Sequence, residues 1–159
     1  MAGRIETRLT ELGVVLPEAP APAANYVPAV ISGSTLYVSG QLPFGPDGLT
    51  ATGRLGENVT VEQAREAAKL CAVNILAQAR AALGDLDRIG RVVKLTGFVA
   101  STPEFYDQPK VVNGASDFLA EALGEAGRHA RSAVGVAALP LGAAVEVEAI
   151  IEISSGAGA

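Results

Sequence analysis

The segment VEVEAIIEI, residues 145–153, alternates apolar and charged side chains and constrains the fold more than any other stretch. Successive side chains of a strand point to opposite faces of a sheet. One face of this strand is therefore wholly apolar, while the other carries Glu146, Glu148 and Glu152 together with Ile150. The apolar face needs a cover, and helices elsewhere in the chain can supply it. The pattern predicts a sheet with one face buried under helices.

A second predicted strand, RVVKLTGFVA at residues 91–100, is apolar on both faces. Val93, Leu95 and Val99 alternate with Val92 and Phe98. Helices on one side of a sheet cannot cover its other side, so a further cover is required. A copy of the same chain is the simplest cover for an apolar sheet face. The patterning therefore predicts an oligomer without giving its order.

Caps and periodicity predict a long helix in the middle of the chain. Thr60 and Gln63 match a capping box, and Gly84 ends the helix after Leu83. Its apolar stripe lies on one face only and consists of Ala64, Ala67, Ala68, Cys71, Ile75, Ala79 and Leu83. A shorter helix is expected over residues 4–12, ended by Gly13.

Turn-forming residues place the other elements. Residues 27–41 are predicted to form a hairpin around Ser-Gly-Ser, and residues 41–58 a loop. A second helical stretch is expected to start at residues 102–104, to break or kink at Pro109, and to resume through Leu123. Strands at 131–139 and 143–153 end the fold.

The order of elements is strand, strand, helix, strand, helix, strand, strand. This order predicts an α+β fold in which two helices pack on one face of a sheet. The length of 159 residues suits a single domain. We expect an N-terminal helical extension over residues 1–19 and a core over residues 20–153.

Composition narrows the possible functions. The net charge of −5 disfavours a nucleic acid partner. No apolar run is long enough to span a membrane, and the N-terminus lacks the apolar core of a signal peptide. The lone cysteine, Cys71, cannot form an internal disulfide and is expected in the core, so a cytoplasmic location is predicted. No paired Cys/His set suggests zinc, and no metal site is expected.

An arginine stands at the head of an otherwise apolar run. Residues 127–140, GRHARSAVGVAALP, place Arg131 before a series of small apolar side chains. A partly buried arginine keeps its charge and needs an anionic partner, from the protein or from a ligand. His129, the only histidine, shares a strand face with Arg131; it is most simply a solvated or hydrogen-bonded residue.

Several motifs, in order and with compatible spacing, resemble one family. They are APAANYVPAV, LYVSGQLP, VVN before the second helix, and ARSAVGVAALP followed by VEVEAI. The chain resembles the RidA/YjgF family of reactive-intermediate deaminases, as a divergent and longer branch. The resemblance implies a chorismate-mutase-like fold with a single mixed β-sheet, assembled as a homotrimer. The chain departs from the group at His129, where proline is frequent, and at Ala133, where cysteine is frequent.

The resemblance also implies a site in a cleft between subunits. Arg131 stands where an arginine holds a substrate carboxylate, which suits the fork of a guanidinium. Tyr26 matches a tyrosine that lines the cleft, Gly40 a glycine that supplies backbone contacts, and Asn113 an asparagine that shapes the site. The partner of Arg131 is then a ligand, a small carboxylate or imino acid.

The implied reaction is hydrolysis of a 2-imino or 2-enamino acid to a 2-keto acid and ammonia. No cofactor is expected, because an imine carbon is already electrophilic. Glu146 matches the glutamate that orients the attacking water, and Glu148, on the same face, is the substitute for that role. Tyr26 or a water would assist the leaving nitrogen.

Two other classes of function remain open. A non-catalytic trimer could bind small carboxylate metabolites in the same cleft, and it would keep Arg131 but not need Glu146. An endoribonuclease is the weaker alternative, because the chain is acidic and has few aromatic residues.

Overall fold

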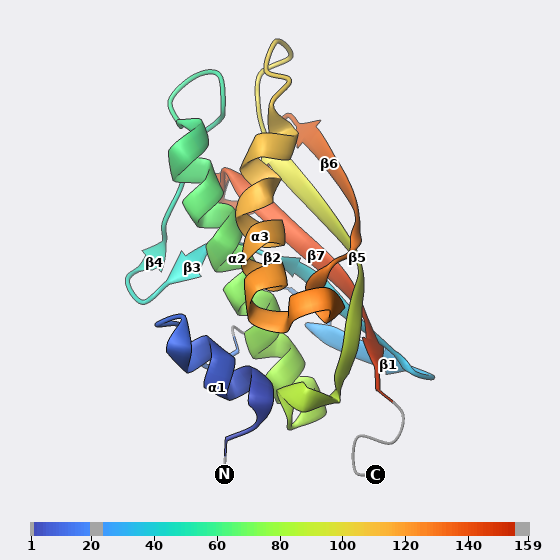
Figure 1. The fold of residues 1–159 in the computed structure, drawn as a ribbon. Coiled ribbons are helices and arrows are strands. Elements are labelled where there is room, and N and C mark those ends of the chain that lie inside the picture. Colours follow the sequence, from blue (N-terminus) through green and yellow to red (C-terminus); the bar gives the residue numbers. More distant parts are fainter. Residues whose placement is uncertain (1, 20–23, 155–159) are drawn as a thin grey trace.

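The computed structural model describes residues 2–19 and 24–154, which form a sheet of five strands with helices on one face (Figure 1). The helices are α1 (Arg4–Glu11), α2 (Val61–Leu83) and α3 (Gln108–Leu123). The sheet strands are β1 (Ala29–Ser32), β2 (Thr35–Gln41), β5 (Ile89–Ala100), β6 (Ala130–Val136) and β7 (Val145–Ile153). A separate short hairpin is formed by β3 (Phe44–Gly45) and β4 (Gly48–Leu49).

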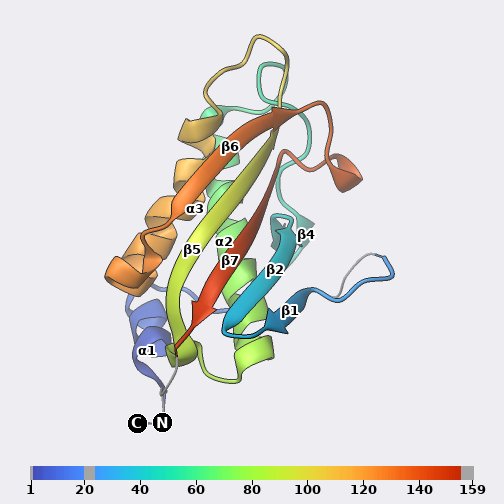
Figure 2. The same cartoon turned by 90° about the vertical axis from the view of Figure 1, so that its right-hand side faces the viewer.

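The strand order is β1-β2-β7-β5-β6, and the sheet is mixed as predicted. Strands β5 and β6 run parallel, because α3 crosses between them, while the other neighbours are antiparallel. Helices α2 and α3 cover one face, and Figure 2 shows the strands from the opposite side. The short helix predicted over residues 4–12 is confirmed as α1. It packs against α3 and against the short 3₁₀ turn at Leu86–Arg88, which adds a third helix to the two predicted to lie on the sheet.

The alternation of β7 is confirmed: its five apolar residues at odd positions are buried, and Glu146, Glu148 and Ile150 are partly exposed. The alternation expected in β5 is wrong at two residues, Val92 and Val93. Val92 is buried against the helices and Val93 is exposed, because the register shifts between Val92 and Lys94. This β-bulge inserts an extra residue and reverses the pattern before it.

Helix α2 begins with the predicted capping box. The Thr60 hydroxyl accepts from the Gln63 amide at 3.1 Å, and the Gln63 side chain accepts from the Thr60 amide at 2.9 Å. Its apolar stripe is buried, but the expectation of one buried face is wrong for residues 71–79, which are all buried. The sheet, α3 and β3 enclose this part of the helix, and Asn74 Nδ2 donates to the carbonyls of Leu42 and Phe44.

Helix α1 is tied to the rest of the domain by one carboxylate. Asp87 accepts hydrogen bonds from the backbone amides of Arg4 at 2.7 Å and Ile5 at 2.9 Å. These bonds to the helix N-terminus lower the pKa of the Asp87 carboxyl, and the largest cause is the bond from Ile5. Ile5 and Leu9 are buried in the main core. The boundary expected between residues 19 and 20 lies partly outside the described residues.

The second long helix starts later than the sequence suggested. No helix forms at residues 102–104; α3 begins at Gln108 and continues unbroken through Leu123. Pro109 lies in the first turn, where its missing N–H would have had no helical partner. Asn113 therefore lies inside α3 and not before it.

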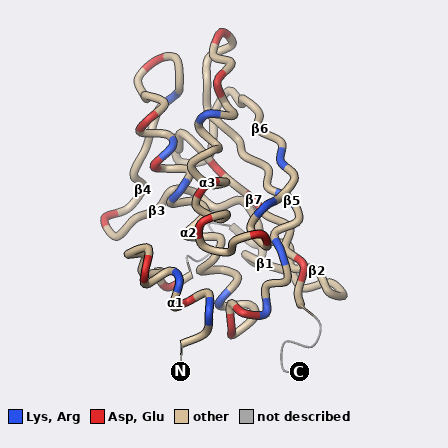
Figure 3. Tube along the Cα trace, viewed as in Figure 1, with Lys and Arg blue, Asp and Glu red and all other residues tan. Residues whose placement is uncertain are grey.

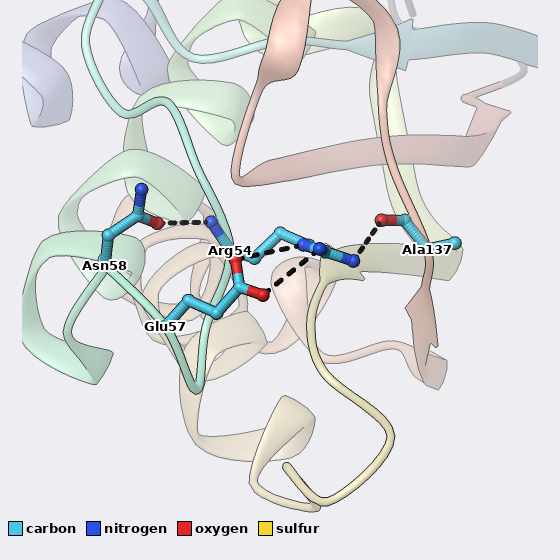
Figure 4. Close-up of polar contacts among 4 residues, drawn as sticks. All are labelled: Arg54, Glu57, Asn58 and Ala137. Carbon is cyan, nitrogen blue, oxygen red and sulfur yellow. Dashed lines mark hydrogen bonds and ion pairs between the residues drawn. The ribbon is translucent and has the colours of Figure 1, made fainter.

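The predicted loop 41–58 contains the β3–β4 hairpin and is anchored at its far end. Figure 4 shows Arg54 between Glu57, at 3.1 and 3.3 Å, and the carbonyl of Ala137, at 3.3 Å. The Arg54 amide also donates to Asn58 Oδ1 at 2.9 Å. Strand β6 ends at Val136 and not at residue 139, and the carbonyl of Ala137 directly after it is the one that Arg54 contacts.

Candidate functional site

Arg131 lies on the edge strand β6 and faces the helices. It is opposite Leu95 in the parallel pair of β5 and β6, and Leu95 is fully buried under the helical layer. Its guanidinium lies against one side of α3. Nη1 donates to Asn113 Oδ1 at 2.8 Å and to Ser116 Oγ at 3.1 Å, while Nη2 donates to the carbonyl of Pro109 at 3.4 Å. These three residues share one helix face by their spacing.

The three acceptors of Arg131 are neutral. Among residues 2–19 and 24–154, no ion pair involves Arg131, and its Nε meets no hydrogen-bond acceptor. Both hydrogens of Nη1 are used, whereas Nη2 makes only one long contact. The edge formed by Nε and Nη2 is therefore available, and it has the geometry that binds a carboxylate through two parallel hydrogen bonds.

Ser116 is a site residue that the sequence analysis missed. Its hydroxyl contacts Arg131 on one side and His129 Nε2, at 2.9 Å, on the other. The spacing of three from Asn113 places it on the same helix face, which is the signal that could have found it. Asn113, Ser116, His129 and Arg131 thus form one hydrogen-bonded group, here called the Arg131 cluster.

His129 is hydrogen-bonded at both ring nitrogens. Nδ1 lies 2.6 Å from the carbonyl of Gly127, and Nε2 contacts Ser116. Burial lowers the pKa of the imidazole; the bond to Gly127 opposes this shift, and the charge of Arg131 adds to it. His129 is therefore a neutral, half-buried side chain, in agreement with the hydrogen-bonded role that the sequence indicated.

Glu146 lies on the opposite side of the sheet. It extends from β7 beside Phe98 of β5, on the face without helices. Burial raises the pKa of the Glu146 carboxyl above its ordinary value, and the charge of Glu148 raises it further. A carboxyl group with a raised pKa can take up and return a proton closer to neutral pH than an ordinary one.

Gly40 and Glu146 are adjacent. A Cβ atom at position 40 would overlap the carboxyl group of Glu146 in its present conformation, so any other residue there would displace this side chain. Glu148 lies further along the same face, where it lines a shallow hollow of about 290 Å³ with Tyr37 and Ser39. Gly40 and the two glutamates are here called the Glu146 cluster.

Tyr26 lies in the segment before β1, with about half of its surface exposed. Among the described residues, no hydrogen bond joins the Tyr26 side chain to either cluster. The two clusters are also separate from each other, because β5 lies between β6 and β7 and the clusters lie on opposite faces. Neighbouring strands are about 4.8 Å apart, so two strand spacings and the sheet itself separate the clusters.

The rest of the described chain shows neither a metal-binding group nor a patch of one charge. Within the described residues no three His, Cys, Asp or Glu side chains gather to hold a metal ion, and no helix there is long and apolar enough to cross a membrane. Lysine and arginine alternate with acidic residues along the helices and loops (Figure 3). Cys71 is buried, and burial raises the pKa of its thiol, with the charge of Glu146 as the second cause.

Comparisons with known proteins agree with this fold. Residues 6–153 match the family described as "YjgF/chorismate_mutase-like, putative endoribonuclease". Protein TCP17 of Trypanosoma cruzi is 54% identical over 155 residues, which is 97% of each chain. A solved relative is the protein Atu1372 of Agrobacterium tumefaciens, a protein with unknown function, which is 60% identical in sequence. It superposes with a TM-score of 0.88 and covers 94% of this chain and 92% of its own.

A named enzyme is also among the relatives. The 2-iminobutanoate/2-iminopropanoate deaminase of Dermatophagoides farinae is 34% identical over 137 residues, 86% of this chain and 92% of the relative. The chain therefore belongs to the YjgF/RidA family and has its chorismate-mutase-like fold, with a mixed sheet and three helices.

Proposed function

We propose that the protein hydrolyses 2-imino and 2-enamino acids to 2-keto acids and ammonia, with Arg131 holding the substrate carboxylate. The observation that carries this proposal is the state of the Arg131 guanidinium. Neutral acceptors on α3 hold it, no carboxylate in the described chain opposes its charge, and its Nε edge is free. A relative at 34% identity is named as a deaminase of this kind.

The proposed site forms between copies of the chain. Arg131 and Glu146 lie on opposite faces of one sheet, so one small ligand cannot contact both within a single chain. The face without helices also exposes apolar side chains, among them Val30, Tyr37 and Val134. Such a face is expected to be covered in an assembly. We propose a homotrimer in which the Arg131 cluster of one copy faces the Glu146 cluster of the next.

The reaction follows from this placement. Water attacks the C=N carbon and forms a C–O bond, and the Glu146 carboxylate takes a proton from that water. The proton held by Glu146 passes to the nitrogen and gives a tetrahedral amino alcohol. The hydroxyl proton of this intermediate then also passes to the nitrogen, and the C–N bond breaks as the C=O bond forms, which releases ammonia and a 2-keto acid. Tyr26, or a water, assists the nitrogen. Holding the carboxylate fixes the imine carbon beside the water, which supplies the orientation that the reaction needs.

The deciding experiment generates imines with an amino-acid oxidase acting on aliphatic, aromatic and acidic amino acids. Imine decay and ammonia release are followed with and without the protein. Acceleration by the wild type supports the proposal. If no imine in the panel decays faster, the deaminase proposal fails, and carboxylate binding by calorimetry then identifies a binding protein.

A further inference from the structure

The hydrogen bonds of the Arg131 cluster have a fixed direction. The carbonyl of Gly127 can only accept, so the contact at 2.6 Å requires the proton on His129 Nδ1. In a neutral imidazole the other nitrogen, Nε2, is then an acceptor. The Ser116 hydroxyl must therefore donate to Nε2 across 2.9 Å, which directs its lone pairs toward Arg131 Nη1 at 3.1 Å. Each group in this chain of hydrogen bonds sets the orientation of the next.

We propose that Ser116 and His129 act as a positioning pair that holds the Arg131 guanidinium in its carboxylate-binding orientation. This inference rests on the proposed role of Arg131. With Asn113 at 2.8 Å, Ser116 occupies both hydrogens of Nη1 and so prevents the guanidinium from turning. The edge with Nε and Nη2 then faces the ligand. Because the arginine side chain is already ordered, ligand binding does not have to supply the free energy of ordering it.

The neutral state of His129 is part of this arrangement. A charged imidazole would donate from both nitrogens, and the Ser116 hydroxyl would then meet a cation on each side. Burial and the nearby Arg131 charge both lower the pKa of His129, so the accepting form is the stable one.

Ser116 and His129 are positioning residues and not catalytic ones, because neither is required to touch the ligand. Losing the pair should weaken ligand binding uniformly, in the ground state and in the transition state alike. Such a loss raises KM and leaves kcat nearly unchanged. A purely structural role would instead lower the melting temperature and the active fraction, without this split.

Binding of 2-ketobutyrate, measured by calorimetry, tests the pair. We expect Ser116→Ala and His129→Leu each to weaken binding about tenfold, the scale of one hydrogen bond to a charged group. Ser116→Thr keeps the hydroxyl and His129→Gln keeps a neutral acceptor, so both should bind within about threefold of the wild type. The matched control is Ser32→Ala, at the exposed last residue of β1. Sedimentation and melting curves confirm that each variant is folded.

A double-mutant cycle tests whether the two residues act as one. The Ser116→Ala/His129→Leu protein should bind no more weakly than Ser116→Ala alone, because the first change already breaks the chain of bonds. Additive losses would overturn the pair. If Arg131→Ala abolishes binding while Ser116→Ala and His129→Leu bind normally, this inference is wrong and the proposed function stands. If Arg131→Ala itself binds normally, the proposed function fails as well.

Discussion

The two faces of the sheet differ in how many of their polar side chains find partners within one chain. On the helix side, the Arg131 cluster is fully organised: its guanidinium, hydroxyl, amide and imidazole contact one another at 2.8 to 3.1 Å. On the other side, the Glu146 cluster has a half-buried carboxyl beside another carboxylate, on a face with exposed apolar side chains. The Arg131 cluster thus holds a guanidinium in a fixed orientation, and the Glu146 cluster holds a carboxyl group with a raised pKa.

In the assembly that we propose, this difference makes the two clusters complementary halves of one site. A cation without a carboxylate partner and a carboxylate without a cation are both unfavourable states, and the sheet keeps them apart within one chain. Contact between copies would bring them together and would cover the apolar face in the same step. The predictions below test this division, beginning with the largest expected effect.

Glu146→Gln should keep carboxylate binding but slow imine hydrolysis by about a hundredfold to ten-thousandfold, the usual contribution of a positioned general base. The amide keeps the shape of the side chain and cannot accept the proton of water. Glu148→Gln, on the same face but further from Gly40, is the matched control and should have a much smaller effect. Imine-absorbance kinetics on a freshly generated 2-imino acid measure both. If only Glu148→Gln slows imine hydrolysis, Glu148 and not Glu146 is the general base.

Arg131→Ala should weaken binding of 2-ketobutyrate by about a hundredfold or more, because a buried carboxylate would lose its cation. Arg131→Lys should also bind poorly, since a single ammonium group cannot reproduce the two parallel bonds of the guanidinium. Arg128→Ala, nearby and exposed, serves as the control for net charge. Calorimetry that shows normal binding by Arg131→Ala would make Arg131 a structural residue.

Tyr37→Asp should weaken assembly by about tenfold or more, because it introduces a charge on the apolar face that we expect a second copy to bury. Tyr37 is exposed in the single chain, so the change should leave the protomer folded. Val15→Asp is the control: Val15 is equally apolar and more exposed, but it lies in the segment after α1, away from the sheet. Sedimentation should show a trimer for the wild type and the control. A wild type that sediments as a monomer at micromolar concentration contradicts the prediction.

The sequence predicted what local rules decide. The capping box at Thr60, the closing Gly84 and the alternation of β7 depend on neighbouring residues, and all three are confirmed. The exposed state of Val93 depends on a bulge, which arises from pairing between strands distant in the sequence. Pro109 suits either a kink or a first turn, and only the packing of the preceding segment decides between them.

The sequence predicted some residues of the candidate site on each face of the sheet but not how these residues are grouped. Arg131 and Gly40 were proposed as site residues from motifs, whereas the adjacency of Gly40 and Glu146 appears only in the structure. Ser116 was missed because α3 and β6 meet only in three dimensions. Its spacing of three from Asn113 places it on the same helix face, but that spacing does not show that β6 packs there. The separation of the two clusters was also hidden, since alternation along each strand does not show which faces of different strands coincide.

The smallest effect, and the one that compares the two faces directly, is the pH dependence of stability. The pKa of His129 is lowered in the folded protein, so the unfolded chain binds more protons just below the ordinary value of about 6.5. The contribution of His129 to the free energy of unfolding is therefore complete above that value. It is lost as the pH falls through the pKa that His129 has in the folded protein. The pKa of Glu146 is raised, so the folded protein binds more protons above the ordinary carboxyl range. The contribution of Glu146 to the free energy of unfolding is therefore present at acid pH and is lost as the pH rises through its pKa in the folded protein.

The two clusters should therefore respond to pH in opposite directions, and neutral variants should separate them. Relative to the wild type, His129→Gln should gain stability as the pH falls below about 6.5, and Glu146→Gln should gain stability as the pH rises above the carboxyl range. Urea unfolding at a series of pH values measures both at fixed protein concentration, which keeps assembly constant. Equal pH profiles for His129→Gln and the wild type would mean that the imidazole titrates alike in both states, and the low-pH difference between the two faces would then be absent.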